Sequence, residues 1–591
     1  MSPAMLKKLN SILDTGQKIR ICGLMFMILI GGLLETAGVS LVLPLISAIL
    51  DEKSFAENIY VEKIMDMFGI SDVRSMIYVL LIALALMFVI KNAYLVMLTY
   101  LQSRFVNKNR SRHTTNLLSQ FLHRPYEYYL YAETSVIVRT IYGDMDNVFN
   151  LLQQCMNLAA EMVVSVCLGV FLLIVDPKMM IVIVGLLGLV TVIIMKFIKP
   201  KLGRVGDEAR EAQAGLYKWI LQPVTGIKDV KVLNKEDYCT DRYNEKAVEY
   251  ADKQVSNNVL TNLPRLLIET VAIVGILAYV GISMMVGSNM SDLLPLISAF
   301  GLAAMRLLPS VNRVNTYMAN IAYYEPALNY IYDHVDTAAM RDQEKIDKER
   351  RAHPNTKAIE LKKEIKLEHV TFAYPNTDKK IFDDADMLIP VGRSIGVMGP
   401  SGAGKTTVID ILLGLLKVQK GSVTSDGTDI FENYEAWLSH VGYIPQSIYM
   451  LDGSIKENIA FGVKPEQINE DRVWEVLEQA QMKEFVQEQP LGLESQIGER
   501  GVRISGGQRQ RLGIARALYH DPELLIFDEA TSALDTETET AIMEAVDALH
   551  GQKTLVIIAH RLRTIENCDI IYEVKEGKIC RSSKDSIKQQ I

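Results

Sequence analysis

The sequence has few of the features that mark secreted or nucleic-acid-binding proteins. Its 591 residues include only six cysteines, and no two of them form a C-x-x-C pair. Disulfide frameworks and structural zinc sites need cysteines in number and at close spacing, so we expect neither. The net charge is −8 and no basic tail is present, so nothing indicates a nucleic-acid partner.

A cleavable signal peptide is also not evident. The first apolar run begins at Ile21, is about as long as a full membrane span, and lacks a small-residue cleavage site. We expect this run to remain in the protein as a membrane helix. The segment before Ile21 is too short to hold a processing protease domain.

The first half of the chain is rich in long apolar runs. Hydrophobic residues make up 49% of the sequence, and here they form runs near the ~20 residues that cross the hydrocarbon of a bilayer. Lysines and arginines gather before the first run and after the second and fourth, which places these ends in the cytoplasm. We expect six membrane helices, at residues 21–50, 76–100, 147–175, 179–198, 264–285 and 293–308.

The expected cytoplasmic connections, residues 101–146 and 200–263, are much longer than turns. Their helix-like pattern predicts that the membrane helices continue for tens of Å into the cytosol, at about 1.5 Å per residue. Segments at the ends of these hairpins, residues 132–140 and 219–231, could press on a soluble domain. On periodicity alone, a solvated loop fits both segments equally well.

The composition changes abruptly after Tyr332. Residues 333–364 are rich in charge and have no sustained apolar period, which indicates a linker. Short β-rich runs then alternate with helical segments, and this order predicts an α/β domain. We expect strands at residues 365–372, 394–398, 441–444, 524–528, 554–559 and 570–574. The expected domains are a helical membrane domain at 1–332, the linker, and an α/β P-loop nucleotide-binding domain at 365–591.

Residues 399–406 read G-P-S-G-A-G-K-T and directly follow an apolar run. In this context the spacing predicts a phosphate-binding loop, because the glycines let successive backbone N–H groups converge on phosphate oxygens at a helix N-terminus. Lys405 would neutralise phosphate charge, and the Thr406 hydroxyl would bind Mg²⁺. The alternative, a glycine-rich turn before a helix, explains neither of these two side chains.

Four further motifs follow in the second half. They are Ile504 to Gln508 (I-S-G-G-Q), Leu524 to Glu529 (L-L-I-F-D-E), Ser532 to Asp535 (S-A-L-D), and His560. In this order they resemble the motifs of ATP-binding cassette (ABC) exporter half-transporters, with Ile504 where that family has leucine. The six-span layout extends the resemblance over nearly the whole chain.

Two acidic residues stand where hydrolysis would need them. Apolar residues before Asp528 predict a buried strand that holds this carboxylate at its tip, where it can position Mg²⁺. Glu529 is placed to polarise the attacking water as general base. Gln446 could contact Mg²⁺ or the water, and His560 could bind the γ-phosphate and orient Glu529. The expected magnesium-site residues are Thr406, Gln446 and Asp528.

The resemblance implies further roles. Tyr374 stands where the family stacks an aromatic ring on adenine, although a tyrosine that caps a turn is the simpler alternative. The signature residues would complete the nucleotide site of a partner subunit, and residues 496–501 resemble a segment that senses the coupling helices. The expected ATP-binding residues are Tyr374, Gly399, Pro400, Ser401, Gly402, Ala403, Gly404, Lys405, Thr406, Thr407, Gln446 and Asp528. The residues that act on the partner's nucleotide would be Ser505, Gly506, Gly507 and Gln508.

One phosphate loop and one signature per chain imply that two chains make two composite sites. Because every motif position is intact, a homodimer is the simplest assembly. The expected protein is an integral multi-pass protein of the bacterial inner membrane, with its ATPase domain in the cytoplasm and with ATP and Mg²⁺ as cofactors.

Charged residues inside the expected spans are candidates for substrate contact, because each is costly in a bilayer. Three cations, Lys91, Arg265 and Arg306, fall in the cytoplasmic half of their spans. Such a group suits a lipid with an anionic head that enters from the inner leaflet, such as a pyrophosphate. Pairing of Lys91 or Arg265 with Glu35, Glu161 or Glu269 is an equal alternative.

The segments 33–44 and 306–313 favour substrate contact over internal pairing. They resemble the first and sixth spans of bacterial flippases for polyprenyl-pyrophosphate-linked oligosaccharides. The favoured function is therefore an ATP-driven flippase for such a lipid. A lipid or multidrug exporter is a second hypothesis. An ATP-gated channel or regulatory ATPase is a third, against which the intact Glu529 and His560 argue.

Overall fold

A computed structural model describes residues 3–40, 73–175, 177–285, 290–352, 355, 357–498, 501–529, 536–559 and 562–582. The chain forms two compact units. The first unit comprises Met1–Arg124 and Ala132–Ala352, and the second comprises Pro125–Tyr131 and His353–Ile591.

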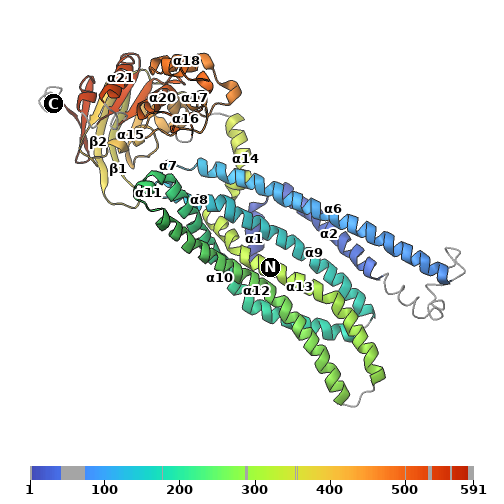
Figure 1. Ribbon diagram of the computed structural model, residues 1–591. Helices are drawn as coiled ribbons and strands as arrows, with labels where there is room; N and C mark the ends of the chain where they lie inside the picture. The colour runs from blue at the N-terminus through green and yellow to red at the C-terminus, as the bar shows by residue number, and fades with distance from the viewer. Residues whose placement is uncertain are drawn as a thin grey trace. The chain divides into compact units, whose positions relative to one another are not determined.

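The first unit is entirely helical within the described residues (Figure 1). The predicted spans at 76–100, 147–175, 179–198, 264–285 and 293–308 each lie within one helix, and the described part of the first span lies within another. Residues 41–50 and the loop 51–72 fall outside the described residues. The helices are α1 (Pro3–Ile12), α2 (Thr15–Ser40), α6 (Val73–Leu122), α8 (Thr134–Arg139), the π-helix η1 (Thr140–Asp144), α9 (Met145–Val175), α10 (Pro177–Thr225), α11 (Ile227–Val232), α12 (Glu236–Met285), α13 (Met290–His334) and α14 (Thr337–Ala352).

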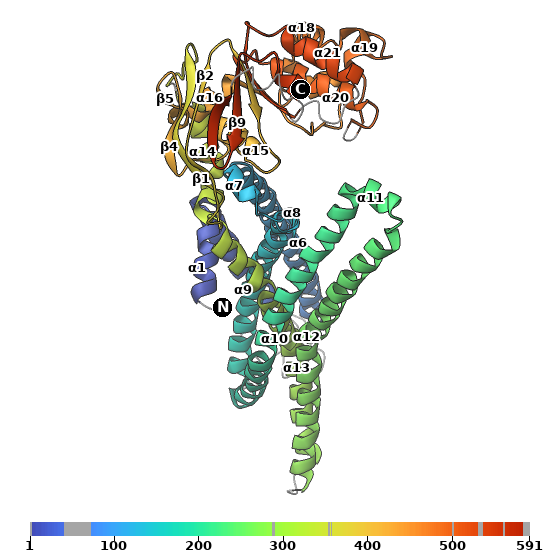
Figure 2. The same cartoon turned by 90° about the vertical axis from the view of Figure 1, so that its left-hand side faces the viewer.

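The predicted extension of the membrane helices is confirmed. Helices α6 and α12 have 50 residues each and α10 has 49, so each is about 75 Å long. Because the bilayer core is only about 30 Å thick, more than half of each helix lies outside it. Figure 2 shows α11 at the tip where α10 and α12 are joined.

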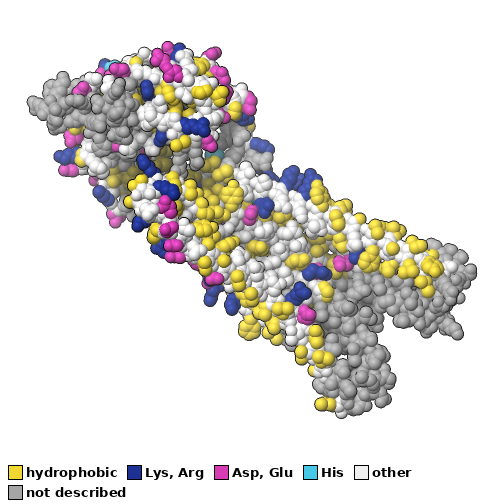
Figure 3. All heavy atoms as spheres, in the orientation of Figure 1, with side chains coloured by type: hydrophobic (Ala, Val, Ile, Leu, Met, Phe, Trp, Pro, Cys, Tyr) yellow, Lys and Arg dark blue, Asp and Glu magenta, His cyan; other side chains and the backbone are white. Residues whose placement is uncertain are grey.

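The outer face of α6 is strongly apolar. Tyr78, Ile82, Val89 and Val96 are each about two-thirds exposed, and Figure 3 shows apolar side chains along this helix. A soluble protein rarely exposes a patch of this kind, whereas a bilayer accommodates it. By length and hydropathy, Thr15–Ala37 and Ser75–Leu122 qualify as membrane spans among the described residues.

Helices α10 and α13 approach each other closely because small residues lie between them. A Cβ atom on Gly206 would lie 2.2 Å from the backbone oxygen of Tyr323. Leu202, Ala209 and Ala319 pack into the same buried cluster. The contact therefore requires glycine at position 206.

A buried carboxylate fastens the start of α9 to α10. Asp144 is fully buried, and its two oxygens accept hydrogen bonds from Arg139 Nε (3.2 Å) and Arg210 Nε (2.6 Å). Both guanidinium groups also lie over the ring of Tyr330 in α13, at 4.9 and 4.0 Å from its centroid. Asp144 and its two arginines thus tie together α8, η1, α10 and α13.

The second unit contains two sheets. The antiparallel sheet has the order β2 (Lys380–Pro390), β1 (Glu364–Ala373), β4 (Lys420–Ser425), β5 (Thr428–Asp429). The other sheet has the order β10 (Lys578–Ser582), β9 (Ile570–Lys575), β3 (Ser394–Met398), β8 (Thr554–Ile558), β7 (Leu524–Asp528), β6 (Val441–Ile444), and all its pairs except β9–β10 are parallel. The six predicted strands are confirmed, and the carboxyl ends of β3, β7 and β6 meet at one edge.

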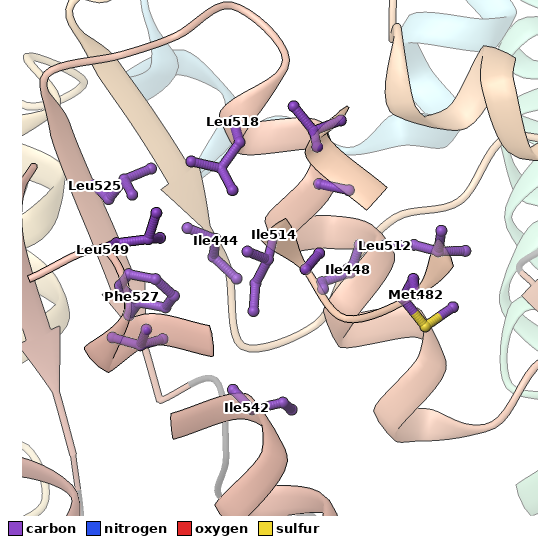
Figure 4. Packing of buried hydrophobic residues seen from close by; sticks show 14 of the residues in the cluster. Ile444, Ile448, Met482, Leu512, Ile514, Leu518, Leu525, Phe527, Ile542 and Leu549 are labelled. Atoms are coloured by element: carbon purple, nitrogen blue, oxygen red, sulfur yellow. The ribbon is translucent and has the colours of Figure 1, made fainter. Parts of the chain in front are cut away.

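Short helices surround these sheets. Figure 4 shows one buried cluster, in which Ile444 and Phe527 of the parallel strands pack with Ile514 and Ile542 of two of these helices. The described helices are α7 (Tyr126–Tyr129), α15 (Lys405–Leu412), α16 (Tyr434–Ser439), α17 (Ile455–Ile459), α18 (Glu470–Gln479), α19 (Lys483–Gln487), α20 (Gly506–Leu518), α21 (Thr536–Asp547) and α22 (Leu562–Ile565), with 3₁₀ turns at Ile430–Asn433, Pro465–Gln467 and Gly492–Glu494.

The expected linker 333–364 is partly helical, since α14 occupies Thr337–Ala352 and belongs to the first unit. Pro125–Tyr131 belongs to the second unit, while residues 132–140 belong to the first. The contact of residues 132–140 with a soluble domain stays a prediction. The second predicted tip, residues 219–231, begins inside α10, which extends to Thr225. The short helix α11 then forms the turn between α10 and α12.

Candidate nucleotide site

The predicted phosphate loop joins β3 to α15. Gly399, Gly402 and Gly404 have φ values of 154°, 77° and 106°, which side-chain-bearing residues rarely adopt. Space is also limited: a Cβ atom would lie 2.4 Å from the Val574 oxygen at Gly399, and 2.7 Å from a methyl carbon of Ile381 at Gly404. The loop conformation therefore depends on glycine at both places.

Lys405 points back into this loop. Its ammonium donates hydrogen bonds to the backbone oxygens of Gly399 (3.0 Å) and Pro400 (3.2 Å), and the residue is only 6% exposed. A buried positive charge thus lies within a loop whose neighbouring residues Ser401 and Thr406 are exposed. This arrangement suits a phosphate group with a metal ion beside it.

The two acidic residues lie where β7 ends. All of β7 is buried, and Asp528 is 6% exposed. Glu529 follows with a φ of 50°, and its backbone N–H donates to the oxygen of Ile558 in the neighbouring strand (3.1 Å). The Gln446 amide donates to the Glu529 carboxylate at 3.0 Å. The structure thus brings together two predicted residues that are far apart in sequence.

The charges at this edge suit a divalent cation. Burial and the neighbouring Glu529 raise the pKa of Asp528, against the influence of Tyr443 and Lys405. A cation would relieve this repulsion, and the hydroxyl of Thr406, the amide oxygen of Gln446 and the carboxylate of Asp528 are the hard oxygen ligands that Mg²⁺ prefers. The residues present therefore fit a magnesium nucleotide. The predicted residues His560, Ser532 to Asp535, Glu499 and Arg500 lie outside the described residues.

Two residues near this edge were not predicted from the sequence. The Tyr443 hydroxyl donates to Asp528 Oδ2 at 3.3 Å, and Asp410 lies in α15, where burial and the charge of Asp528 raise its pKa to about 6. A signal for each was available. Tyr443 lies on the strand next to β7, and Asp410 is the only acid in the apolar helix after the phosphate loop.

Tyr374 is anchored beside the phosphate loop. Its hydroxyl lies 3.0 Å from Thr407 Oγ1, and its ring meets Phe372 edge-on at 5.2 Å between centroids. The residue is only partly buried. Its predicted role in adenine stacking stays a prediction.

The signature residues form the start of α20. The Ser505 hydroxyl accepts from the Gln508 backbone N–H (3.2 Å), and the Gln508 side chain accepts from the Ser505 backbone N–H (2.8 Å). This capping box fixes the exposed helix start. Ser505 and Gly506 are exposed, while Gly507 is buried. Their predicted action on a partner's nucleotide stays a prediction.

The segment 125–131 is in contact with residues around the site within the second unit. The Tyr131 hydroxyl donates to the Pro375 oxygen (2.9 Å), and the Glu127 carboxylate accepts from the Lys417 backbone N–H (3.3 Å). Partial burial and the charge of Asp410 raise the pKa of Tyr126. This segment therefore reaches the turn after Tyr374 and the region after α15.

In the first unit, the alternative pairing of Lys91 or Arg265 with a carboxylate is not seen among the described residues, whereas their contact with a substrate stays a prediction. Glu161 accepts two hydrogen bonds from Arg313, at 2.7 and 3.0 Å. Lys91 lies over the ring of Phe88 at 4.5 Å, and Arg265 is exposed. Among the described residues, no carboxylate forms an ion pair with Lys91 or Arg265. Arg306 lies in α13, but its side chain is outside the described part of the structure.

Comparison with known proteins agrees with this architecture. Residues 21–305 match the family described as ABC transporter transmembrane region, and residues 382–532 match the family described as ABC transporter. The solved structure of a bacterial Atm1-family ABC exporter with ATP bound has a TM-score of 0.72 and 21% identity, and the match covers 98% of this chain and 97% of that one. Fold and site thus define an exporter-type membrane domain fused to an ABC ATPase domain. The chain belongs to the ABC transporter family.

Relatives with assigned names are similar over part or most of the chain. The ATP-dependent lipid A-core flippase of Sodalis glossinidius (strain morsitans) is 37% identical over 47% of this chain and 46% of the relative. This chain therefore spans about half the length of that relative. The multidrug resistance ABC transporter ATP-binding and permease protein of Lactococcus lactis subsp. lactis (strain IL1403) is 29% identical over 80% of this chain and 78% of the relative.

Proposed function

We propose that two copies of this chain form an ATP-driven flippase that moves a polyprenyl-pyrophosphate-linked oligosaccharide from the inner to the outer leaflet. The observation that carries the substrate assignment is the state of Lys91 and Arg265. Each is a cation in a predicted membrane span, and neither forms an ion pair with a described carboxylate. An unpaired charge inside a bilayer is costly, so a residue that carries one is a candidate for function.

The energy comes from ATP in this proposal. Lys405 and the loop glycines hold the phosphates, Thr406, Gln446 and Asp528 hold Mg²⁺, and Glu529 activates water. When bound, Mg²⁺ would neutralise charge that develops on the phosphates. His560 would contact the γ-phosphate and help to orient Glu529.

The assembly is a homodimer in this proposal. Each chain supplies one phosphate loop and one signature, so a complete pair of sites needs two chains. The tip formed by α11 gives further support. Ile227, Val232 and Leu233 there are 47%, 75% and 63% exposed, and apolar side chains at such exposure are typical of a surface that a partner covers.

Transport follows as a two-state switch. ATP between two cassettes would favour a closed dimer, and hydrolysis would remove the γ-phosphate contacts that hold it closed. The long helices α6, α10 and α12 would carry this change to the membrane cavity, where the cations of α6, α12 and α13 receive the anionic head group.

A lipid or multidrug exporter is the second candidate, and the relative from Lactococcus lactis favours it. The two hypotheses differ in their need for positive charge. A pyrophosphate requires cations, whereas a neutral or cationic amphiphile does not.

The test is transport by the purified protein in proteoliposomes. A fluorescent polyprenyl-pyrophosphate oligosaccharide would be scored for ATP-dependent change in its accessibility to an external glycosidase. We expect the Lys91→Gln, Arg265→Gln, Arg306→Gln triple variant to lose at least about tenfold in rate, and a Lys53→Gln, Lys63→Gln control in the expected outer loop to keep it. Transport by the triple variant at the parental rate would refute the substrate assignment. Absence of any phosphate release by the parent would refute an active transporter.

A further inference from the structure

A polar cavity of about 200 Å³ lies among the helices of the first unit. It lies between α10, α12 and α13, with Asn147 of α9 at its edge. Most of its lining is aromatic hydroxyl or amide. The polar and aromatic side chains that line the cavity are Asn147, Arg210, Gln213, Tyr250, Gln254, Asn257, Tyr323 and Tyr324.

Local packing keeps the cavity in shape. Gly206 allows α10 to reach the backbone of Tyr323, so the tyrosine is held on one side. On the other side the Gln254 amide donates to the Tyr323 hydroxyl at 3.0 Å. The rings of Tyr323 and Tyr324 meet edge-on at 5.3 Å. The aromatic wall is thus fixed before any ligand binds, which lowers the ordering cost of binding.

Several polar groups that line the cavity form no hydrogen bond with another described residue. No described residue forms a hydrogen bond with the Asn147 amide or with the hydroxyls of Tyr250 and Tyr324. No carboxylate is among the described lining residues, and the one cation, Arg210, is already bonded to Asp144 and Asp207. A neutral ligand that both donates and accepts hydrogen bonds suits this lining.

One wall of the cavity lies on the same face of α12 as the membrane cation Arg265. Gln254 and Arg265 are eleven residues apart in α12, which is three turns, so they share a face and lie about 16 Å apart. In the expected orientation, Gln254 is on the cytoplasmic side of Arg265. A lipid with its anionic group near Arg265 would extend its polar head toward this cavity.

We infer that this cavity binds one neutral sugar ring of the substrate's head group. The inference rests on the proposed function and adds to it a site that binds the glycan and not the pyrophosphate. The volume is below the ~300–1,000 Å³ of sites for drug-sized ligands, so the cavity takes one ring and not a whole oligosaccharide. Tyrosine faces would pack on the ring, while the hydroxyls and amides bind its hydroxyl groups.

The test uses a Tyr250→Phe, Tyr324→Phe double variant, which removes two hydroxyls and keeps both rings. Tyr243→Phe is the matched control, because Tyr243 is partly exposed on the same helix two turns away and does not line the cavity. The full-length protein in lipid nanodiscs would be titrated with a short-chain polyprenyl pyrophosphate that carries one N-acetylglucosamine, and with the same lipid without sugar. Stimulation of ATPase activity is the readout.

We expect the double variant to need about tenfold more of the glycosylated lipid for half-maximal stimulation, since it loses two hydrogen bonds. Its response to the sugar-free lipid and its melting temperature should equal those of the parent and of the control. An equal loss for both lipids, or no loss for either, would overturn the inference.

A second measurement separates this inference from the proposed function. Binding of methyl N-acetylglucosaminide and methyl glucoside at millimolar concentration would be followed by saturation-transfer NMR, with no lipid substrate present. Signal with the parent that disappears in the double variant supports the cavity even if no lipid stimulates the ATPase, in which case the proposed function alone fails. No signal with the parent would overturn the cavity as a sugar site.

Discussion

Tyr443 connects the strand that leads to Gln446 with the carboxylate of Asp528, two parts of the candidate site that belong to different sequence motifs. It lies three residues before Gln446, and its hydroxyl donates to the carboxylate of Asp528. A carboxylate with one oxygen fixed in this way presents its other oxygen in a defined direction. Tyr443 is therefore a positioning residue for the predicted magnesium site.

Replacement of Tyr443 by phenylalanine should weaken the response to magnesium more than the maximal rate. Because the ring stays and only the hydroxyl is lost, we expect the Mg²⁺ concentration for half-maximal ATPase activity to rise about three- to tenfold, equivalent to roughly one hydrogen bond. Phosphate release would be measured over a magnesium series at saturating ATP. Tyr434→Phe is a suitable control, because the Tyr434 hydroxyl donates to the backbone oxygen of Leu413 and not to Asp528. An unchanged magnesium dependence would show that the hydroxyl positions nothing.

At the scale of elements, the junction of η1, α9, α10 and α13 depends on one buried acid. Asp144 is fully buried between two arginines, so its removal leaves two buried cations without their shared partner. Loss of one member of such a group costs about 3–5 kcal/mol. The exposed Asp207 also pairs with Arg210, at 3.5 Å, but its side chain is 64% exposed, and exposed pairs contribute about 0–1 kcal/mol.

We therefore expect Asp144→Asn to lower the melting temperature of the detergent-solubilised protein by several degrees, whereas Asp207→Asn changes it little. Both substitutions remove one negative charge near the same arginine, so net charge cannot explain a difference between them. The melting temperatures would be compared by differential scanning fluorimetry with both variants in one detergent. Equal shifts would mean that the buried pair does not stabilise this junction.

The elements themselves could largely be predicted, because they depend on local pattern. Continuous apolar runs gave β3, β6 and β7 their observed bounds, and long apolar segments located the described membrane helices. Strand β2 was missed although Ala385, Met387 and Ile389 alternate inward, because Asp383, Asp384 and Asp386 share the segment. An exposed acidic face resembles a loop when only composition is read.

The pairing of distant side chains could not be predicted. Arg313 joins Glu161 across 152 residues, and nothing in either local sequence selects this partner over Lys91. The contact of segment 125–131 with the rest of the second unit could not be predicted either, since it depends on where two distant parts of the chain meet. Motif residues were easier to locate because their spacing is set by the ligand they bind, as in the loop 399–406.

At the scale of the whole molecule, the question is which subunit's signature serves which nucleotide. The capping box leaves Ser505 at an exposed helix start, and the positive end of a helix attracts phosphate. In the proposed homodimer, each site combines the phosphate loop of one chain with the signature of the other. A Lys405→Ala chain then has a defective loop and a good signature, and a Ser505→Arg chain has the reverse.

A heterodimer of these two variants distinguishes the arrangements. With two different affinity tags it can be purified from both homodimers, and nucleotide trapped by orthovanadate can be counted per dimer. If the signature acts across the dimer, the intact loop of the Ser505→Arg chain meets the intact signature of the Lys405→Ala chain, so one site is complete and the other carries both defects. We expect trapping in the heterodimer at about half the parental amount and near background in both variant homodimers. If each signature served its own chain, each site would carry one defect and the heterodimer would trap no more than the homodimers do.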